Sequence, residues 1–267
     1  MAPMPVPDHK TITSIKNPIV QRCRAAAGGD DAQALLAEGV RLCGEGLDAG
    51  LKVLAALVSP RLKEPALAER LRAATAEFAE CSDEVLARVS ALETHQGVAV
   101  VFGRPRWTND QLLRSDLSPL VVAAAGVRDP GNLGALVRTS EAAGATGFVA
   151  MQGGADPFRE KAVRGAMGST FRLPTVYGFD AAALLELCRH QKLQLVVADG
   201  AGEKDYLDAD WRRPTVLVIG AEAAGVPAEL TRAASLRVRI PIARKVDSLN
   251  VAVAAGVLLF EARRQRR

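Results

Sequence analysis

Three short segments of the chain combine residue types that bind anions and small ligands. In the first, a turn at residues 129–131 leads into a predicted helix, with Asn132 at its start and Arg138 roughly two turns farther on. The free N–H groups at the start of a helix attract anions. This segment could therefore hold a phosphate or a carboxylate, or it could be an ordinary turn with an asparagine cap and a surface arginine.

The second segment, residues 220–227, places Glu222 between Gly220 and Gly225. Glycine has no side chain, so a ligand can approach the backbone closely at both positions. The carboxylate of Glu222 could order an arginine or accept a hydrogen bond, or it could complement the dipole of the following helix. The segment is thus a candidate binding loop.

The third segment, residues 240–250, places Ser248 and Asn250 directly before the apolar run Val251–Phe260. Polar groups at such a junction need hydrogen-bond partners. A helix cap would explain Asp247 or Ser248. Asn250, inside the first turn of the predicted helix, is harder to explain in that way and is a candidate ligand contact.

Several common kinds of reactive site are missing from the sequence. It contains no Walker A pattern, and the glycines of residues 44–50 lack the spacing of a Rossmann fingerprint. The only histidine in the C-terminal part, His190, falls on an ordinary amphipathic helix. The four cysteines are widely separated: Cys23, Cys43, Cys81 and Cys188. Their spacing matches neither a zinc site nor a set of disulfides, so we expect reduced thiols and no bound metal.

The composition is that of a globular protein with room for two domains. The chain has 267 residues, of which 49% are apolar, 24% charged and 4% aromatic. Its C-terminal apolar run is about half of the ~20 residues that a membrane-spanning helix needs. Residues 1–10 lack the apolar core of a signal peptide. We therefore expect a cytoplasmic protein without a membrane partner.

The positive charge is concentrated in the C-terminal part. Residues 1–105 carry 12 Lys or Arg and 13 Asp or Glu, whereas residues 106–267 carry 22 and 17. Four arginines lie within residues 263–267. They could contact a nucleic-acid backbone, or they could form a solvated helix end favoured by the helix dipole.

A change of composition at residues 103–118 divides the chain. That stretch lacks sustained periodicity, so we place a linker at 106–118, between domains at 1–105 and 119–267. In the first domain, apolar runs alternate with helical patterns, which predicts a small α/β fold. The expected strands are 53–58 and 98–102, and the expected helices lie near 38–50, 64–74 and 82–90.

The second domain has the pattern of a parallel α/β sheet. Its short apolar runs show no polar alternation, as in strands that are covered on both faces. The expected strands are 120–125, 148–151, 193–198 and 216–219, and the expected helices lie near 132–144, 158–168, 180–191, 226–234 and 247–264. Ligands bind at the carboxyl ends of such strands, so we expect the three segments to share one crevice.

The order of the three segments resembles the SpoU/TrmH family of S-adenosylmethionine-dependent RNA 2′-O-methyltransferases, part of the SPOUT superfamily. The first matches N-x-G-x-x-x-R through Asn132, Gly134 and Arg138, the second matches G-x-E-x-x-G, and the third matches the stretch that ends in SLNVAVA. The resemblance covers residues 119–267. More loosely, residues 13–20 and 36–39 are similar to the L30e-like substrate-binding domain often joined to such enzymes.

The resemblance implies a fold, a cofactor and partners. We expect a deep trefoil knot in the second domain, a homodimer built on the final helices, bound S-adenosylmethionine and an RNA substrate. The presence of the N-terminal domain favours ribosomal RNA as the substrate, and transfer RNA is the alternative substrate. A non-catalytic RNA-binding ribosome-assembly factor of the same fold is a further alternative.

The resemblance also assigns roles to individual residues. The family gives the motif arginine the task of deprotonating the ribose, but a guanidinium keeps its proton with a pKa above ~12. A clamp on phosphate and on developing alkoxide charge is the better physical role. Arg244 stands where many relatives have glycine. The expected catalytic residues are Asn132, Arg138, Glu222, Ser248 and Asn250; the cofactor residues are Ala198, Asp199, Gly200, Gly220, Ile240 and Leu249; the RNA contacts are Lys161 and Arg164.

Overall fold

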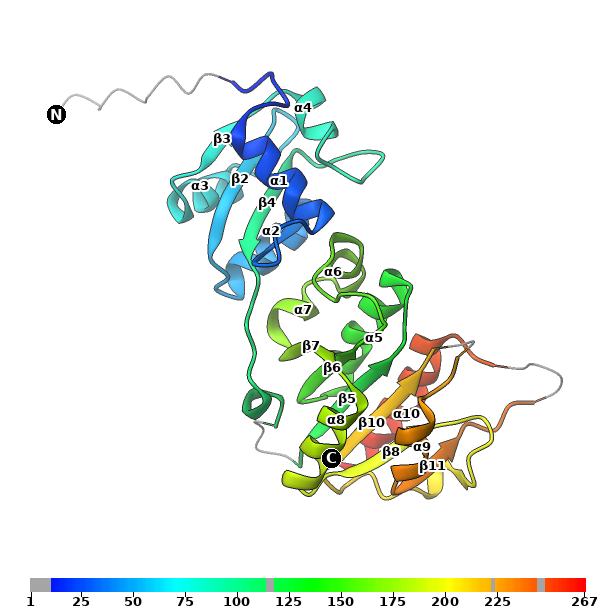
Figure 1. The fold of residues 1–267 in the computed structure, drawn as a ribbon. Helices are drawn as coiled ribbons and strands as arrows, with labels where there is room; N and C mark the ends of the chain where they lie inside the picture. The colour runs from blue at the N-terminus through cyan, green and yellow to red at the C-terminus, as the bar shows by residue number, and fades with distance from the viewer. Residues whose placement is uncertain (1–10, 114–117, 222–223, 244–247) are drawn as a thin grey trace. The chain divides into compact units, whose positions relative to one another are not determined.

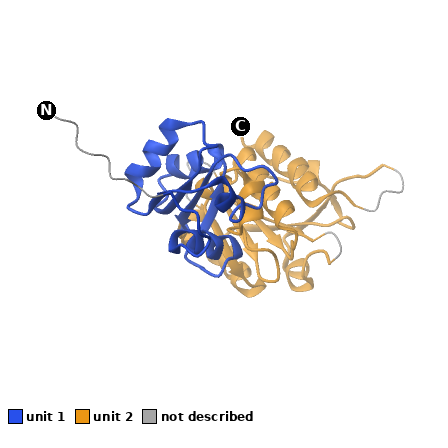
Figure 2. Ribbon diagram, turned by 90° about the horizontal axis from the view of Figure 1, so that it is seen from above, with its two compact units in different colours: residues 1–105 blue, residues 106–267 orange. Residues whose placement is uncertain are grey.

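The computed structural model describes residues 11–113, 118–221, 224–243 and 248–267 (Figure 1). The chain divides into two compact units, residues 1–105 and 106–267, which Figure 2 colours separately. Each unit has its own sheet and its own buried core. The two units are therefore described one at a time.

Unit 1 is a four-stranded sheet with the strand order β1-β4-β2-β3. β4 runs antiparallel to β1 and β2, whereas β3 is parallel to β2. The two predicted strands and three predicted helices are confirmed to within a few residues. The elements are β1 (Ala34–Glu38), β2 (Val53–Val58), β3 (Phe78–Glu80) and β4 (Val98–Gly103), with α1 (Pro18–Gly28), α2 (Val40–Asp48), α3 (Pro65–Ala74) and α4 (Asp83–Ala87).

Three elements of unit 1 were not predicted: α1, β1 and β3. Local signals for α1 were present, because Asn17 caps the helix by accepting a hydrogen bond from the Ile19 N–H (2.9 Å) and Gly29 ends it in a left-handed conformation. β1 was hidden because only Gly39, at φ +85°, separates it from α2. The helix predicted over 38–50 therefore began one or two residues too early.

All four cysteines are buried and unpaired. Burial raises the pKa of the Cys23 thiol to about 12, and it raises the pKa of Cys81 and of Cys188 to about 11. Their thiolate forms are therefore scarce at neutral pH. The four side chains pack as small apolar groups, in agreement with the sequence analysis.

Unit 2 contains a seven-stranded sheet in the order β7-β6-β5-β10-β8-β11-β9, and every pairing in it is parallel. All four predicted strands are confirmed. Three strands were not predicted, because they lack a continuous apolar run: Gly178 interrupts β7, arginines alternate with apolar residues in β11, and β9 has only two residues. The strands are β5 (Leu120–Ala125), β6 (Gly147–Met151), β7 (Thr175–Phe179), β8 (Gln194–Ala198), β9 (Lys204–Asp205), β10 (Thr215–Gly220) and β11 (Leu236–Arg239).

Helices cover both faces of this sheet. Leu120, Val122 and Ala124 of β5 pack in one core with α5 and α10, while Val121 and Ala123 pack in the other with α8 and α9. No helix in the described ranges is both long and apolar enough to cross a membrane. The helices are α5 (Pro130–Ala143), α6 (Glu160–Ala166), α7 (Ser169–Arg172), α8 (Ala181–His190), α9 (Ala228–Ala233) and α10 (Val251–Gln265), with short 3-10 helices η1 (Asn109–Leu113) and η2 (Tyr206–Asp208).

The last two strands along the chain, β10 and β11, each lie in the sheet between two strands that precede them in sequence. β10 pairs with β5 and β8, and β11 pairs with β8 and β9. The carboxyl ends of β8, β10 and β11 therefore lie side by side. The trefoil knot that the resemblance implies stays a prediction.

The stretch expected to be a linker begins with an ordered turn. In η1, Leu112 is fully buried in the core of unit 2, and its carbonyl oxygen accepts a hydrogen bond from the Thr146 hydroxyl (2.7 Å). A Cβ atom on Gly147 would lie 2.7 Å from the Leu112 side chain. Residues 109–113 are thus packed against the start of β6.

The arginines near the C-terminal end of α10 are engaged within unit 2. Arg266 donates hydrogen bonds to the carbonyl oxygens of Trp211 (2.6 Å), Arg213 (2.7 Å), Pro119 (3.3 Å) and Ser118. Burial lowers its pKa to about 10, so it remains charged at neutral pH. Arg263 donates to the Ala142 carbonyl oxygen (2.8 Å). Two interpretations of this tail were open from the sequence, a solvated helix end and a phosphate contact. Arg266 fits neither of them, because it is bound to carbonyl oxygens within unit 2.

A buried carboxylate joins this end of α10 to the loop before β10. Glu261 accepts hydrogen bonds from Arg264 and from Gln265, each at 2.8 Å. Gln265 also donates to the Ala209 carbonyl oxygen (3.1 Å) and accepts from the Trp211 N–H (3.0 Å). The hydrogen bonds from Arg264 and Gln265 lower the pKa of Glu261 to about 2.

We expect Glu261→Gln to destabilise unit 2 at pH 7 and to matter less as the pH falls. The folded pKa lies below the ordinary 4.5, so the stabilisation is present above about pH 4.5 and is lost toward pH 2. Urea unfolding followed by tryptophan fluorescence measures it, because both tryptophans, Trp107 and Trp211, lie in unit 2. The exposed Glu186→Gln is the control. A difference independent of pH would contradict this assignment.

Candidate active site

A cavity of about 640 Å³ lies at the carboxyl ends of β8, β10 and β11. Its volume falls within the roughly 300–1,000 Å³ typical of small-molecule sites. The wall includes all six residues predicted to hold a cofactor, together with Ser248: Ala198, Asp199, Gly200, Gly220, Ile240 and Leu249. The second and third segments thus contribute to one hollow, together with the loop after β8, whereas no residue of the first segment is part of its described wall.

The glycines of the second segment close their own loop. A Cβ atom on Gly220 would lie 2.3 Å from the carbonyl carbon of Gly225, and the Gly225 N–H donates to the Ala221 carbonyl oxygen (2.8 Å). Gly225 itself has φ +63°. The sequence analysis explained both glycines by close approach of a ligand. The structure shows that Gly220 is needed for the tight turn, whereas open space remains beside Gly225 as well as beside Gly200.

The cavity wall is mostly apolar. Ile219, Ile240 and Leu258 line it, and the carboxylate of Asp199 is held at its edge. One oxygen of Asp199 accepts from the Ala201 N–H (2.9 Å), and the other lies 3.6 Å from Arg237. Apolar walls with a few fixed polar groups suit a small organic ligand.

Sequence reasoning missed the contribution of α9 to this cavity. Thr231 and Arg232 line it from that helix. Neither residue belongs to a recognised motif, and α9 has only six residues. The available signal was that α9 directly follows the second segment.

Two predicted catalytic residues meet at the start of α10. Asn250 is the N-cap of that helix, because its Oδ1 accepts hydrogen bonds from the N–H groups of Ala252 (3.0 Å) and Val253 (3.4 Å). Its Nδ2 donates to Oδ1 of Asn132 (3.1 Å). The expectation of a helix starting at 247, with a cap at Asp247 or Ser248, was therefore wrong about the start.

Asn132 is free for this contact because a different residue caps α5. Oδ1 of Asp129 accepts from the Asn132 N–H (2.7 Å), and Oδ2 lies 3.2 Å from Nζ of Lys161. The bond from the Asn132 N–H and that from Lys161 lower the pKa of Asp129. Because the Asn132 side chain is not needed as a cap, it can bond to Asn250.

The glycine of the first motif brings α6 against α5. A Cβ atom on Gly134 would lie 2.3 Å from the carbonyl oxygen of Ala162. This backbone contact holds Lys161 and Arg164 of α6 beside the first turn of α5. Lys161 pairs with Asp129, and Arg164 pairs with Glu160.

Other predicted residues are not joined to this set. Arg138 does not line the cavity, and it makes no hydrogen bond or ion pair with any residue that the structure describes. It lies six residues beyond Asn132, which is about 120° around the helix. Glu222 and Arg244 lie outside the described residues.

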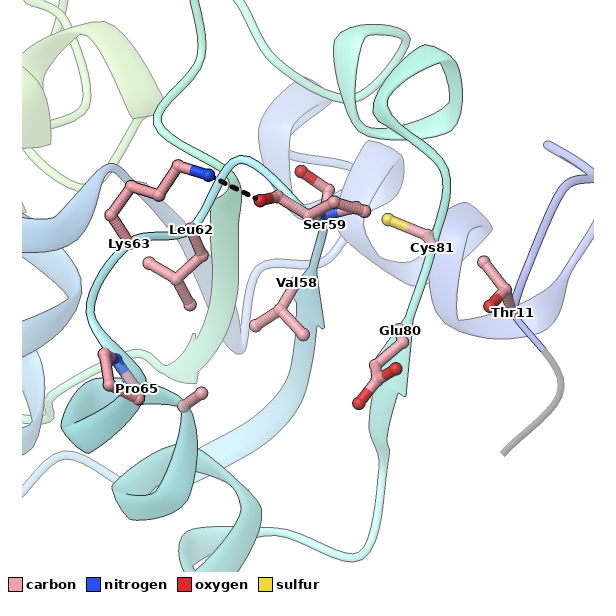
Figure 3. Close-up of a pocket in the computed structure, with 10 residues that line it drawn as sticks. Thr11, Val58, Ser59, Leu62, Lys63, Pro65, Glu80 and Cys81 are labelled. Carbon is pink, nitrogen blue, oxygen red and sulfur yellow. Dashed lines mark hydrogen bonds between the residues drawn. The ribbon is translucent and has the colours of Figure 1, made fainter. Parts of the chain in front are cut away.

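A second cavity, of about 450 Å³, lies in unit 1 (Figure 3). It is lined by Val58 at the end of β2, by Leu62 and Lys63 in the following loop, and by Glu80. The ammonium group of Lys63 donates to the Pro60 carbonyl oxygen (3.4 Å). None of the predicted site residues lines this cavity.

The arrangement in unit 2 can hold a small organic ligand and present it to polar groups. Ser248 and Leu249 line the cavity, and the adjacent Asn250 carries the hydrogen bond to Asn132. Within the described part of the chain, no cluster of His, Cys, Asp or Glu could hold a metal ion. The geometry therefore combines an apolar hollow with an amide pair at its edge.

Two known families match the two parts of the chain. The SpoU rRNA Methylase family matches residues 119–260. The MRM3-like substrate binding domain matches residues 29–100. The first match thus contains the whole described cavity wall, and the second contains β1, β2, β3 and the first half of β4.

Individual relatives are similar over most of the chain. An uncharacterized tRNA/rRNA methyltransferase of Synechocystis is 34% identical over 270 residues, covering 97% of this chain and 95% of that protein. The 23S rRNA (guanosine-2′-O-)-methyltransferase RlmB of Pseudomonas putida is 36% identical over 177 residues, covering 64% and 71%. The crystal structure of an AdoMet-bound rRNA methyltransferase from Sinorhizobium meliloti has a TM-score of 0.85 at 35% identity, covering 96% and 97%.

Two substitutions of Asn250 separate its two hydrogen-bonding roles. Asn250→Ala removes the cap and is expected to lower the unfolding free energy of unit 2 by about 1 kcal/mol. Asn250→Asp keeps an acceptor at the helix start, so we expect a loss below about 0.5 kcal/mol, but it cannot donate to Asn132. Urea unfolding and the Asn132 side-chain NMR signal measure these effects. Equal destabilisation by both variants would contradict the capping role.

Proposed function

The chain belongs to the SpoU rRNA methylase family, and on this premise we propose that it transfers a methyl group from S-adenosylmethionine to a ribose 2′-hydroxyl of ribosomal RNA. The observation that carries the proposal is the single cavity lined by the second and third motif segments, to which the Asn132–Asn250 hydrogen bond joins the first segment. The predicted family resemblance is confirmed, and so is the α/β fold class with a smaller N-terminal domain.

The residues of the cavity fit this cofactor. Ile219, Ile240 and Leu258 offer apolar surface for the adenine ring, and the open side of Gly200 leaves room for close approach. When bound, S-adenosylmethionine supplies a sulfonium methyl group, whose carbon–sulfur bond breaks as the ribose 2′-oxygen bonds to the carbon and releases its proton to water. The cavity then serves to hold the two reactants in line, which can provide much of the rate.

The polar residues are proposed to position the ribose. Because Oδ1 of Asn132 accepts from Asn250, its NH₂ group remains as the donor toward substrate. Arg138 is proposed to bind a phosphate and stabilise the developing alkoxide, since a guanidinium remains protonated. Glu222, Ser248 and Asn250 are proposed to complete the pocket.

RNA is proposed to contact both units. In unit 2, Lys161 and Arg164 lie beside the start of α5 and are partly exposed, so they can exchange their carboxylate partners for phosphates. Unit 1, matched by the substrate-binding family and proposed to be L30e-like, is suited to recognise a folded loop by shape, and its cavity can admit an unstacked base. The names of relatives such as RlmB favour ribosomal over transfer RNA.

A homodimer is proposed through the outer face of α10. Val253 is 55% exposed and Phe260 is 52% exposed, and with Gly256 and Val257 they form a stripe along the helix. An apolar stripe of this kind favours packing against a second helix. A Cβ atom on Gly256 would lie 3.7 Å from the Thr139 side chain, so α5 lies beside this part of α10.

We expect Arg138→Ala to spare cofactor binding and to abolish methyl transfer. Loss of a charge-stabilising group should lower kcat by at least about 10²-fold, with the Kd for S-adenosylmethionine within about twofold. Transfer of labelled methyl to ribosomal RNA and calorimetry measure the two quantities. Arg138→Lys, which keeps the charge, should recover part of kcat without a new pH dependence. Label on a base rather than on ribose would refute the reaction type, and tight RNA binding without any cofactor binding would favour the assembly factor.

The proposed dimer predicts a change of mass for two substitutions. Val253→Asp and Phe260→Asp place a charge in the stripe and should give a monomer in light scattering at micromolar concentration. Leu207→Asp, at an equally exposed apolar position (54%) on η2, is the control and should remain dimeric. A wild-type protein that is monomeric at that concentration would overturn the dimer.

A further inference from the structure

Arg232 is a cation in the cavity wall that has no role in the proposed reaction. It lies in the last turn of α9, lines the cavity and is exposed. Nothing in the described ranges forms a hydrogen bond or an ion pair with it. The two following arginines differ, because Arg237 pairs with Glu203 (2.9 Å) and Arg239 donates to the Gly202 carbonyl oxygen (2.8 Å).

The described part of the cavity wall carries one opposite charge, that of Asp199. Its carboxylate is already compensated, since it accepts from the Ala201 N–H and lies 3.6 Å from Arg237. The charge of Arg232 has no such compensation among the described lining residues. This part of the cavity therefore favours an anionic group on the ligand.

The proposed cofactor has one anionic group. S-adenosylmethionine consists of an adenosine part, for which apolar wall is available, and a methionine part that ends in an ammonium and a carboxylate. A carboxylate enclosed without a partner loses hydration and gains nothing in return. A guanidinium matches a carboxylate with two parallel hydrogen bonds.

We propose that Arg232 binds the α-carboxylate of the methionine part of S-adenosylmethionine and so sets which way round the cofactor lies in the cavity. The inference rests on the proposed function. It adds a specificity role, because a ligand with the adenosine part alone would lose this contact. Arg232 is thereby a binding residue, outside the three family motifs.

Calorimetry with two ligands that differ only in the carboxylate tests this. For S-adenosylmethionine, we expect Arg232→Gln to raise Kd about tenfold, which is about 1.4 kcal/mol. For decarboxylated S-adenosylmethionine, the same substitution should change Kd by less than twofold. Arg232→Lys should fall between the wild type and Arg232→Gln. Arg189→Gln, the same change on the exposed surface of α8, should alter neither Kd.

Each other outcome counts against the proposal. Equal weakening of both ligands would give Arg232 a structural role in the cavity wall. No weakening of either would make it a solvated side chain that complements the end of α9. A wild-type protein that binds neither ligand would contradict the proposed function and this inference together, whereas wild-type binding with no ligand-specific loss in Arg232→Gln would overturn this inference alone.

Discussion

The side-chain amide of Asn250 links the start of α10 to Asn132, which lies 118 positions earlier in the chain. Its oxygen is committed to the first N–H groups of α10, so its nitrogen must point away from them, toward Asn132. A rotation of the amide by half a turn would place two donors against two donors. The orientation of both asparagines is therefore fixed by the geometry of a helix start, and the polar edge of the cavity depends on it.

This arrangement needs α5 and α10 to begin at matching positions. Asp129 ends the preceding turn and caps α5, which leaves Asn132 in its first turn without a capping role. Gly134 then allows α6 to approach within backbone contact. α5 and α10 pack on the same face of the sheet. The groups proposed to face the substrate are thus positioned by main-chain contacts and caps, which are stiffer than long side chains.

The sequence was sufficient for four strands of the large sheet and for the crevice that the second and third motif segments share, whereas the first segment joins them through the Asn132–Asn250 hydrogen bond. Strands buried on both faces leave continuous apolar runs, and parallel strands bring their carboxyl ends to one edge, so one crevice was predictable. The cap at Asn250 was not predictable, because the start of a helix depends on where the chain turns. By residue type, Ser248 and Asp247 were equally good candidates for the cap. Arg232 had no motif to mark it. The insertion of β10 between β5 and β8 leaves no local pattern, since each run would look the same in another order.

Arg266 has a consequence for the order of events during biosynthesis. Its guanidinium joins carbonyl groups around residue 118 to others around residue 212, and it reaches them only from the far end of α10. The Thr215 N–H already donates to the Pro119 carbonyl oxygen (2.9 Å), but the bonds from Arg266 can join the amino ends of β5 and β10 only after the ribosome has released the residues beyond 260. A nascent chain that ends before residue 266 therefore keeps the Thr215 bonds to Pro119 and Arg213 but lacks the guanidinium that connects these carbonyl oxygens to that of Trp211.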